Sequence, residues 1–162
     1  MGPQTEQVAQ PLGTILLVED EPSDAALIQR AFEKVGVRNP IAHLANGDEA
    51  LAYLEGINQY GDRLQFPLPI LIILDLKLPG MSGLQILKWI RTKRDLRLIP
   101  VVVLTGSADP TSVQAAYEAG ANSYLLKPTD RTEIIRVVEA LEQYWMQINV
   151  SPPLVRRAQE NL

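Results

Sequence analysis

The sequence of 162 residues contains no cysteine and a single histidine. The absence of cysteine excludes disulfides, thiolate metal sites and thiol nucleophiles together. An excess of positive charge is also missing, because 15 Lys and Arg face 19 Asp and Glu for a net charge of −4. A protein that binds nucleic acid by neutralising phosphates needs clustered basic residues, so this composition argues against that class.

Segments that would place the chain in or across a membrane are missing as well. The longest apolar stretch, 68–74, is interrupted by Pro69 and is far shorter than the ~20 residues that span a bilayer. Residues 1–13 lack the basic region followed by an apolar region that marks a secretory signal. We therefore expect a cytoplasmic protein that has neither a nucleic acid nor a membrane as its partner.

What the sequence does contain is a regular alternation of short apolar runs and helical patterns. Hydrophobic residues make up 46%, which is close to the globular average, and the length fits one domain. The expected strands cover 14–18, 40–44, 70–74, 100–104 and 123–126, each followed by a segment with apolar residues at helical spacing. Near-continuous apolar strands that alternate with helices specify a parallel sheet covered on both faces. The expected fold class is therefore α/β.

Polar groups follow four of the five expected strands. Ligands of an open parallel sheet bind beyond the carboxyl ends of its strands, where this chain places Glu19, Asp20, Asp75, Thr105 and Lys127. Carboxylates ~4 Å apart repel by about 4 kcal/mol per pair at an effective dielectric constant near 20. Either one of them takes up a proton or a cation binds between them. Oxygen ligands alone favour a hard ion such as Mg²⁺, and one of the acids is a candidate nucleophile for phosphoryl transfer.

The motifs LLVEDEPSD, LIILDLKLPGMSG, VVVLTGSAD and ANSYLLKPTD, in this order and spacing, resemble the receiver domain of two-component response regulators. The resemblance covers residues 13–146, with 1–12 as a disordered lead-in and 147–162 as a C-terminal tail. It implies a flavodoxin-like, doubly wound sheet of five parallel strands in the order 2-1-3-4-5, together with five helices.

The resemblance also implies roles for the residues at the strand ends. Asp75 would accept a phosphoryl group from a phosphohistidine of a sensor histidine kinase. Asp20 and Asp75 would bind Mg²⁺ directly, as would the backbone carbonyl of Lys77, whereas Glu19 would reach the ion through water. Lys127 would pair first with Asp75 and then with the phosphoryl oxygens.

Two further residues would transmit the change. Thr105 would move toward the phosphoryl group and Tyr124 would turn inward behind it, which alters the face made by the fourth helix, the fifth strand and the fifth helix. The resemblance also implies a cis peptide bond between Lys127 and Pro128. The protein would accept a phosphoryl group and lose it slowly, without being a turnover enzyme.

A narrower resemblance concerns the small response regulators that are paired with cyanobacterial phytochromes. It rests on a receiver without a following output module, on the long loop 56–69, and on Tyr144 and Trp145 ahead of a Pro-bearing tail. It implies a phytochrome as the sensor kinase and a homodimer as the assembly.

Other functions stay open at this point. A Mg²⁺-dependent phosphohydrolase with an aspartyl nucleophile usually carries a second acid two residues later, where this chain has Lys77. A nucleotide or flavin module needs a Gly- or Ser-rich first turn that holds phosphate, where this chain has the acidic segment 19–24. A phosphorylation-independent scaffold that dimerises through residues 122–148 would keep the fold without its chemistry.

Three features have structural interpretations instead. His43 is expected to be a surface or half-buried side chain and not a ligand or phosphodonor. Trp145 either packs on the core or, exposed with its neighbours, forms an interface, since aromatic residues are enriched in interfaces. Basic residues on and after the third helix are expected to form a solvated face: Lys88, Arg91, Lys93, Arg94 and Arg97.

Overall fold

Five parallel strands form the centre of the structure, a computed structural model that describes residues 12–153 of the chain. They are β1 (Ile15–Val18), β2 (Ile41–Leu44), β3 (Leu71–Leu74), β4 (Val101–Thr105) and β5 (Ser123–Leu126). Their order is β2-β1-β3-β4-β5, and every neighbouring pair is parallel. The predicted α/β fold with the strand order 2-1-3-4-5 is confirmed.

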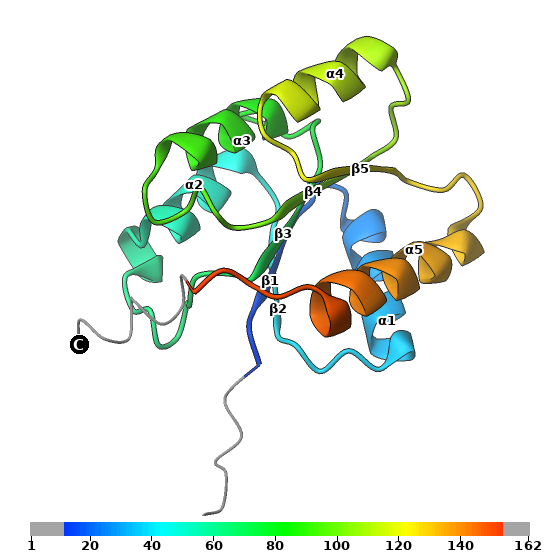
Figure 1. Ribbon diagram of the computed structural model, residues 1–162, viewed down its shortest axis with the longest axis horizontal. Coiled ribbons are helices and arrows are strands. Elements are labelled where there is room, and N and C mark those ends of the chain that lie inside the picture. Colours follow the sequence, from blue (N-terminus) through cyan, green and yellow to red (C-terminus); the bar gives the residue numbers. More distant parts are fainter. Residues whose placement is uncertain (1–11, 154–162) are drawn as a thin grey trace, which may run out of the picture.

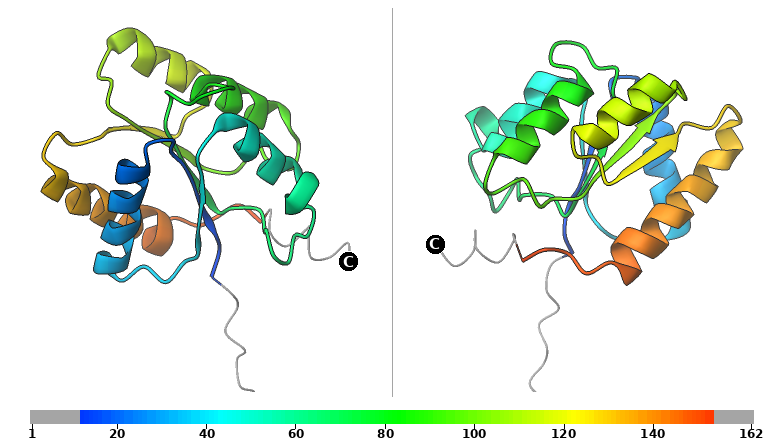
Figure 2. Two further views of the ribbon diagram at one scale, coloured as in Figure 1. Left: turned by 180° about the vertical axis from the view of Figure 1, so that it is seen from behind. Right: turned by 45° about the horizontal axis from the view of Figure 1, so that its top comes forward.

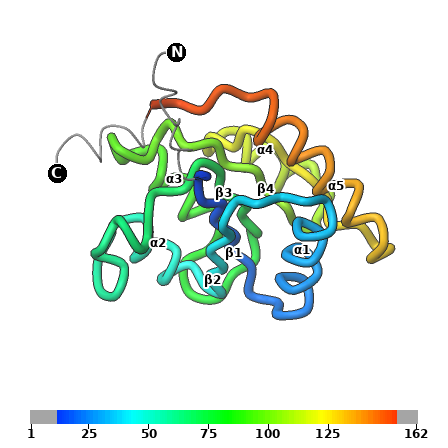
Figure 3. The backbone as a smooth tube through the Cα atoms, turned by 90° about the horizontal axis from the view of Figure 1, so that it is seen from below, coloured from blue at the N-terminus to red at the C-terminus, as the bar shows by residue number. Residues whose placement is uncertain are grey.

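Helices cover the sheet on both faces (Figures 1 and 2). Within the described residues they are α1 (Pro22–Val35), α2 (Gly47–Glu55), α3 (Gly83–Thr92), α4 (Pro110–Glu118) and α5 (Ile134–Leu141). α1 and α5 pack side by side on one face, and α2, α3 and α4 lie on the other, as the end-on view of Figure 3 also shows for α1, α2, α3 and α5. No helix among residues 12–153 is long and apolar enough to cross a membrane.

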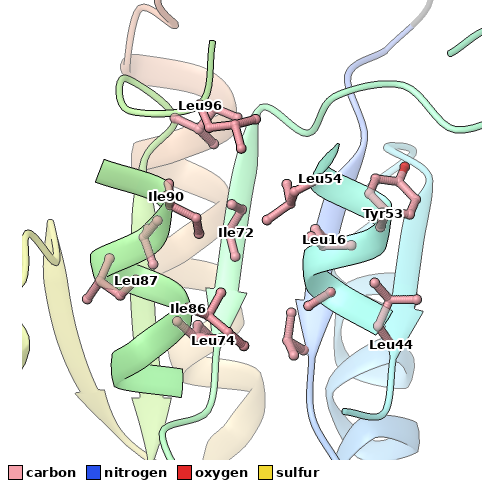
Figure 4. Packing of buried hydrophobic residues seen from close by; sticks show 14 of the residues in the cluster. Leu16, Leu44, Tyr53, Leu54, Ile72, Leu74, Ile86, Leu87, Ile90 and Leu96 are labelled. Carbon is pink, nitrogen blue, oxygen red and sulfur yellow. The ribbon is translucent and has the colours of Figure 1, made fainter. Parts of the chain in front are cut away.

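Two apolar cores result, one on each face of the sheet. Successive residues of a strand point to opposite faces, so Leu16 and Ile72 face α2 and α3 (Figure 4), whereas Ile15 and Leu17 face α1 and α5. All residues of β1 and β3 are buried because helices cover both of their sides. This explains why these strands are continuous apolar runs and do not alternate with polar residues.

The long connection after α2 is packed and ordered by its own side chains. It contains the 3-10 turn η1 (Asn58–Tyr60), and the ring of Tyr60 lies 5.3 Å from that of Tyr53 and 5.1 Å from that of Phe66. The guanidinium group of Arg63 donates to the backbone carbonyls of Tyr53 and Leu54 at the end of α2, at 2.7 Å each. These contacts satisfy carbonyls that a helix end otherwise leaves without partners.

The segment after α5 continues as the π-helical turns η3 (Glu142–Ile148). Trp145 and Met146 are partly buried against the core below α1 and α5, whereas Tyr144 is half exposed. Of the two interpretations of Trp145, packing on the core is therefore the one observed in this chain. The expected lead-in 1–12, apart from residue 12, and the part of the expected tail beyond residue 153 lie outside the described residues. The domain limits 13–146 stay a prediction.

The basic residues of α3 do not all form a solvated face. Arg91 is partly buried and donates hydrogen bonds to the carbonyls of Arg97, Ile99 and Gly120 and to the side chain of Asn122. The prediction was wrong for this residue, because its planar guanidinium group binds several carbonyls that the turns around α3 leave free. Lys88, Lys93, Arg94 and Arg97 are exposed, as expected.

Candidate functional site

The parallel ladder places two acidic residues next to each other just beyond β1 and β3. Val18, the last residue of β1, is opposite Leu44 and Leu74. The backbone N–H of Glu19 donates to Leu44 and that of Asp75 donates to Val18, each at 3.0 Å. These bonds extend the ladder by one residue, so the backbone of the site is as fixed as the sheet itself.

Three carboxylates meet at this edge. One oxygen from each of Glu19, Asp20 and Asp75 lies within 4.8 Å of the others. Glu19 and Asp75 are buried and Asp20 is half-buried. The Glu19 side chain is held by the N–H of Glu21 at 3.1 Å, and the Asp75 side chain by the N–H of Lys77 at 3.3 Å. The predicted acidic residues are thus brought together around one point.

The ammonium group of Lys127 reaches the same point from β5. The Lys127 N–H donates to the carbonyl of Thr105 at 2.8 Å, which fixes the start of the side chain beside the end of β4. Its Nζ lies 2.7 Å from Glu19 Oε2, 2.8 Å from Asp75 Oδ2 and 3.1 Å from Asp24 Oδ2. Two of these contacts, with Asp24 and Asp75, are hydrogen bonds from the ammonium group, and the contact with Glu19 is an ion pair.

The electrostatics of the site show a shortage of positive charge. The pKa of Glu19 is raised to about 7, because burial and, to a smaller extent, the nearby charge of Asp75 outweigh the hydrogen bond from Lys127, which lowers it. For Lys127, burial lowers the pKa, but hydrogen bonds and charges from Asp75 and Glu19 outweigh burial and raise it. One cation among several carboxylates therefore leaves the cluster with unbalanced negative charge.

The donor set fits a hard divalent cation. Its ligand atoms are carboxylate oxygens, which Mg²⁺ and related ions prefer, and the cluster contains no softer ligand. A divalent ion would supply positive charge to a cluster in which Lys127 is the one cation that contacts the carboxylates among the described residues. Glu19, Asp20 and Asp75 are the residues that could hold it.

Thr105 and Tyr124 lie on the neighbouring strands, as expected from their sequence positions. Thr105 is buried at the end of β4, opposite Leu126 of β5. The hydroxyl of Tyr124 donates to the carbonyl of Ser107 at 2.7 Å, in the loop that follows Thr105. Burial, with smaller contributions from the charges of Asp109 and Asp75, raises the pKa of Tyr124. β5 is thereby tied to the loop between β4 and α4.

The expected cis peptide bond between Lys127 and Pro128 is not found. No peptide bond within residues 12–153 is cis, so the prediction differs from the structure here. The trans form of an X–Pro bond is intrinsically favoured by about 0.5–1 kcal/mol. With the trans bond, Lys127 already reaches both Glu19 and Asp75.

Two contacts of the site were missed by sequence reasoning. Asp24 in the first turn of α1 binds Lys127 across 103 residues of sequence. The available signal was its place in the acidic segment that leads from β1 into a helix. His43 is exposed, as expected, but its Nε2 lies 2.8 Å from the backbone carbonyl of Glu19. Its position next to the end of β2 was the only hint of this contact.

Comparison with known proteins shows that the chain is similar to response regulators of two-component systems. The model of the response regulator receiver domain matches residues 15–139. The probable methanogenesis regulatory protein FilR2 of Methanothrix harundinacea (strain 6Ac) is 43% identical over 138 residues, which cover 85% of this chain and 86% of that protein. Response regulator Rcp1 of Synechocystis sp. (strain ATCC 27184 / PCC 6803 / Kazusa) is 35% identical over 144 residues, covering 89% and 96%.

Solved structures of such regulators superpose closely. The Mn(2+)-bound form of response regulator Rcp1 matches with a TM-score of 0.80 and 35% identity, over 86% of this chain and 99% of that one. The phosphorylated cyanobacterial phytochrome response regulator RcpA matches with a TM-score of 0.82 and 32% identity, over 87% and 99%.

Proposed function

Since this chain belongs to the response regulator receiver domain family, we propose that it carries the phosphoryl group of a two-component pathway on Asp75. The observation that supports this most directly is the surroundings of that carboxylate. Asp75 Oδ2 lies 2.8 Å from an ammonium group, and the side chain shares an acidic cluster with Glu19 and Asp20. A carboxylate in these surroundings is both fixed in place and close to groups that bind phosphoryl oxygens.

The covalent step is a transfer between two nucleophiles. An Asp75 oxygen attacks the phosphorus of a phosphohistidine on a sensor histidine kinase, so a P–O bond forms as the P–N bond breaks and the histidine nitrogen leaves. Lys127 donates hydrogen bonds to the phosphoryl oxygens as they arrive. Water later attacks the acyl phosphate and releases inorganic phosphate. The protein loses its phosphoryl group slowly in this way and is not a turnover enzyme.

Mg²⁺ is the divalent ion that we assign to the cluster. Asp20 and Asp75 would hold it directly with the backbone carbonyl of Lys77, and Glu19 would hold it through water. The relative Rcp1 has a Mn(2+)-bound form, and the oxygen donors of this chain suit either ion. When bound, the ion neutralises negative charge on the carboxylates and on the incoming phosphoryl group.

The response passes through Thr105 and Tyr124 to the surface. Movement of Thr105 toward the phosphoryl group displaces the loop that carries Ser107, and the Tyr124 hydroxyl is bonded to that loop. α4 begins at Pro110, three residues after Ser107, so the displacement reaches the face made by α4, β5 and α5. Partner affinity would change at this face.

The names of the relatives support a narrower assignment of the partners. RcpA is a cyanobacterial phytochrome response regulator, and a bacteriophytochrome response regulator, RtBRR, is 35% identical with a TM-score of 0.70 over 93% of this chain and 90% of that one. We infer a phytochrome as the sensor kinase, a cytoplasmic location and a homodimer, with neither nucleic acid nor membrane as a direct partner.

Mass spectrometry tests the assignment of Asp75. Incubation with Mg²⁺ and acetyl phosphate should add one phosphoryl group to the parent protein and to the control Asp95→Asn, whose side chain is exposed and outside the cluster. Asp75→Asn should show no gain. An unmodified parent, or a gain that survives Asp75→Asn, would overturn the proposal. Release of many equivalents of phosphate per chain would favour the phosphohydrolase instead.

A further inference from the structure

Asp24 binds Lys127 from the solvent side of the cluster. Its Oδ2 lies 3.1 Å from Nζ, and its side chain is 36% exposed, whereas Glu19 on the inner side is 1% exposed. The ammonium group is thus held between α1 on the outside and the ends of β1 and β3 on the inside. None of the roles assigned above to Glu19, Asp20 or Asp75 involves α1.

The Asp24 carboxylate is not engaged in capping its own helix. Asp24 is the third residue of α1, where an acidic side chain can bond back to the N–H of the capping residue. In α1 that residue is Glu21, whose N–H donates to Glu19 Oε1 instead, and whose own side chain caps nothing. Among the described residues, the hydrogen-bond partner of the Asp24 carboxylate is Lys127. The contact therefore serves the site and not only the start of the helix.

We propose that Asp24 is a positioning residue that shares Lys127 with the metal-binding carboxylates and so keeps their negative charge available to a divalent cation. The inference rests on the proposed function, because it takes Glu19, Asp20 and Asp75 as the ligands. Lys127 donates hydrogen bonds to Asp24 and Asp75 and forms an ion pair with Glu19, so its charge is shared among three carboxylates. With Asp24 as the outer acceptor at 3.1 Å, part of the donor capacity of the ammonium group is directed toward α1 and is not available to Glu19 and Asp75.

Loss of the Asp24 charge should weaken the binding of a divalent cation in two ways. The cluster loses one negative charge a few ångströms from its centre, which lowers its attraction for a cation. The Lys127 donor that faces Asp24 also loses its acceptor and can turn toward Glu19 and Asp75, which neutralises more of the negative charge that the cation needs. Both effects weaken binding of a divalent ion, whereas a charge lost elsewhere in the same turn produces the first effect alone.

Glu21 offers a matched control for this difference. It is an exposed acid three residues before Asp24, and its side chain has no contact with Lys127 among the ion pairs of the described residues. Glu21→Gln therefore removes one charge from the same turn without releasing the ammonium group. Asp24→Glu keeps the charge and, with a longer side chain, the reach to Lys127.

The test is calorimetric titration of the full chain with Mg²⁺, without phosphodonor. Asp24→Asn should raise the dissociation constant for Mg²⁺ about three- to fivefold, which is the range expected for the loss of a partly exposed ion pair. Glu21→Gln should change it less than about twofold, and Asp24→Glu should restore it toward the parent value. Equal effects of Asp24→Asn and Glu21→Gln, or tighter binding in Asp24→Asn, would overturn the proposal.

A second measurement separates this proposal from the proposed function. In phosphorylation by acetyl phosphate, Asp24→Asn should raise the half-saturating Mg²⁺ concentration more than it lowers the rate at saturating Mg²⁺. If the parent protein binds Mg²⁺ but accepts no phosphoryl group, the proposed function is wrong. The role of Asp24 in Mg²⁺ binding is then still tested by the titration. A parent that binds no Mg²⁺ overturns both.

Discussion

Lys127 Nζ lies 2.8 Å from Asp75 Oδ2, although the two residues come from opposite sides of β4 and are 52 residues apart in sequence. Lys127 Nζ also lies 2.7 Å from Glu19 Oε2. One fixed cation thus holds together the two buried carboxylates that follow β1 and β3. The stability of the metal-free protein and its readiness to bind a cation both depend on this arrangement.

Replacement of the ammonium group should destabilise the metal-free fold. Lys127→Met leaves Glu19 and Asp75 buried without a positively charged partner, and breaking a buried ion pair in this way costs about 3 kcal/mol of unfolding free energy. Mg²⁺ should recover much of this loss because it replaces the missing positive charge. Urea denaturation with and without Mg²⁺ measures both effects, with the exposed Lys88→Met as control. A variant that Mg²⁺ stabilises no more than the parent would contradict the prediction.

The pKa of Glu19 predicts how metal-free stability depends on pH. Its folded-state pKa is raised from 4.5 to about 7, chiefly by burial, so the folded protein binds this proton more tightly than the unfolded chain. The resulting stabilisation is fully present below about pH 4.5 and is lost as the pH rises through 7. Glu19→Gln should remove this part of the pH dependence. The check is denaturation in EDTA between pH 5 and pH 8; identical slopes in both proteins would speak against it.

Asp20 should matter for the cation and not for the fold. It is half-buried, and no ion pair of the described residues includes it, so Asp20→Asn should leave metal-free stability within about 0.5 kcal/mol of the parent. Loss of a direct ligand should weaken Mg²⁺ binding about tenfold or more. Titration calorimetry measures the affinity, with Asp95→Asn as control. Unchanged affinity would remove Asp20 from the ligand set.

Tyr124→Phe should separate phosphorylation from its transmission. The variant loses the hydrogen bond to the Ser107 carbonyl, at a cost of about 1 kcal/mol of unfolding free energy. Acceptance of a phosphoryl group at Asp75 should persist, because the hydrogen bond that is lost is made to Ser107 in the loop after β4. Amide exchange in α4 should respond less to phosphorylation than in the parent. A full response in α4 would show that the bond does not carry the change.

Arg91 should contribute to the stability of the fold and not to the chemistry of the acidic cluster. Its guanidinium group binds the carbonyls of Gly120 and Ile99 and the side chain of Asn122. Lysine cannot reproduce this planar set of donors, so Arg91→Lys should lower the unfolding free energy by about 1–3 kcal/mol. Arg94→Lys at an exposed position is the control. Thermal unfolding measures the difference, and equal melting temperatures for both variants would be the opposite result.

The strand ends explain how much of the site could be predicted from the sequence. β1 and β3 are buried on both faces, so their apolar runs and the acids that follow them are visible in the sequence. Once the strands are parallel and neighbouring, Glu19 and Asp75 must lie at one edge. The apolar strands can be recognised in the sequence, and their parallel pairing fixes which residues are neighbours. The position of the acidic cluster at the strand ends is therefore predictable.

Contacts made by long polar side chains could not be predicted in the same way. Asp24 reaches Lys127 only because α1 starts at Pro22 and turns its third residue toward β5. Arg63 and Arg91 find backbone carbonyls in turns whose shape depends on the folded chain. The spacing of residues indicates which of them share an edge or a face, but the direction of such side chains is decided by tertiary contacts.

The most direct test of the account is chemical mapping of the phosphorylated residue. After reaction with acetyl phosphate and Mg²⁺, borohydride reduces an acyl phosphate to an alcohol, and peptide mass spectrometry locates the reduced position. The account predicts reduction at position 75 alone, abolished by EDTA. Reduction at another carboxylate such as Asp20 or Asp24, or none at all, would contradict it.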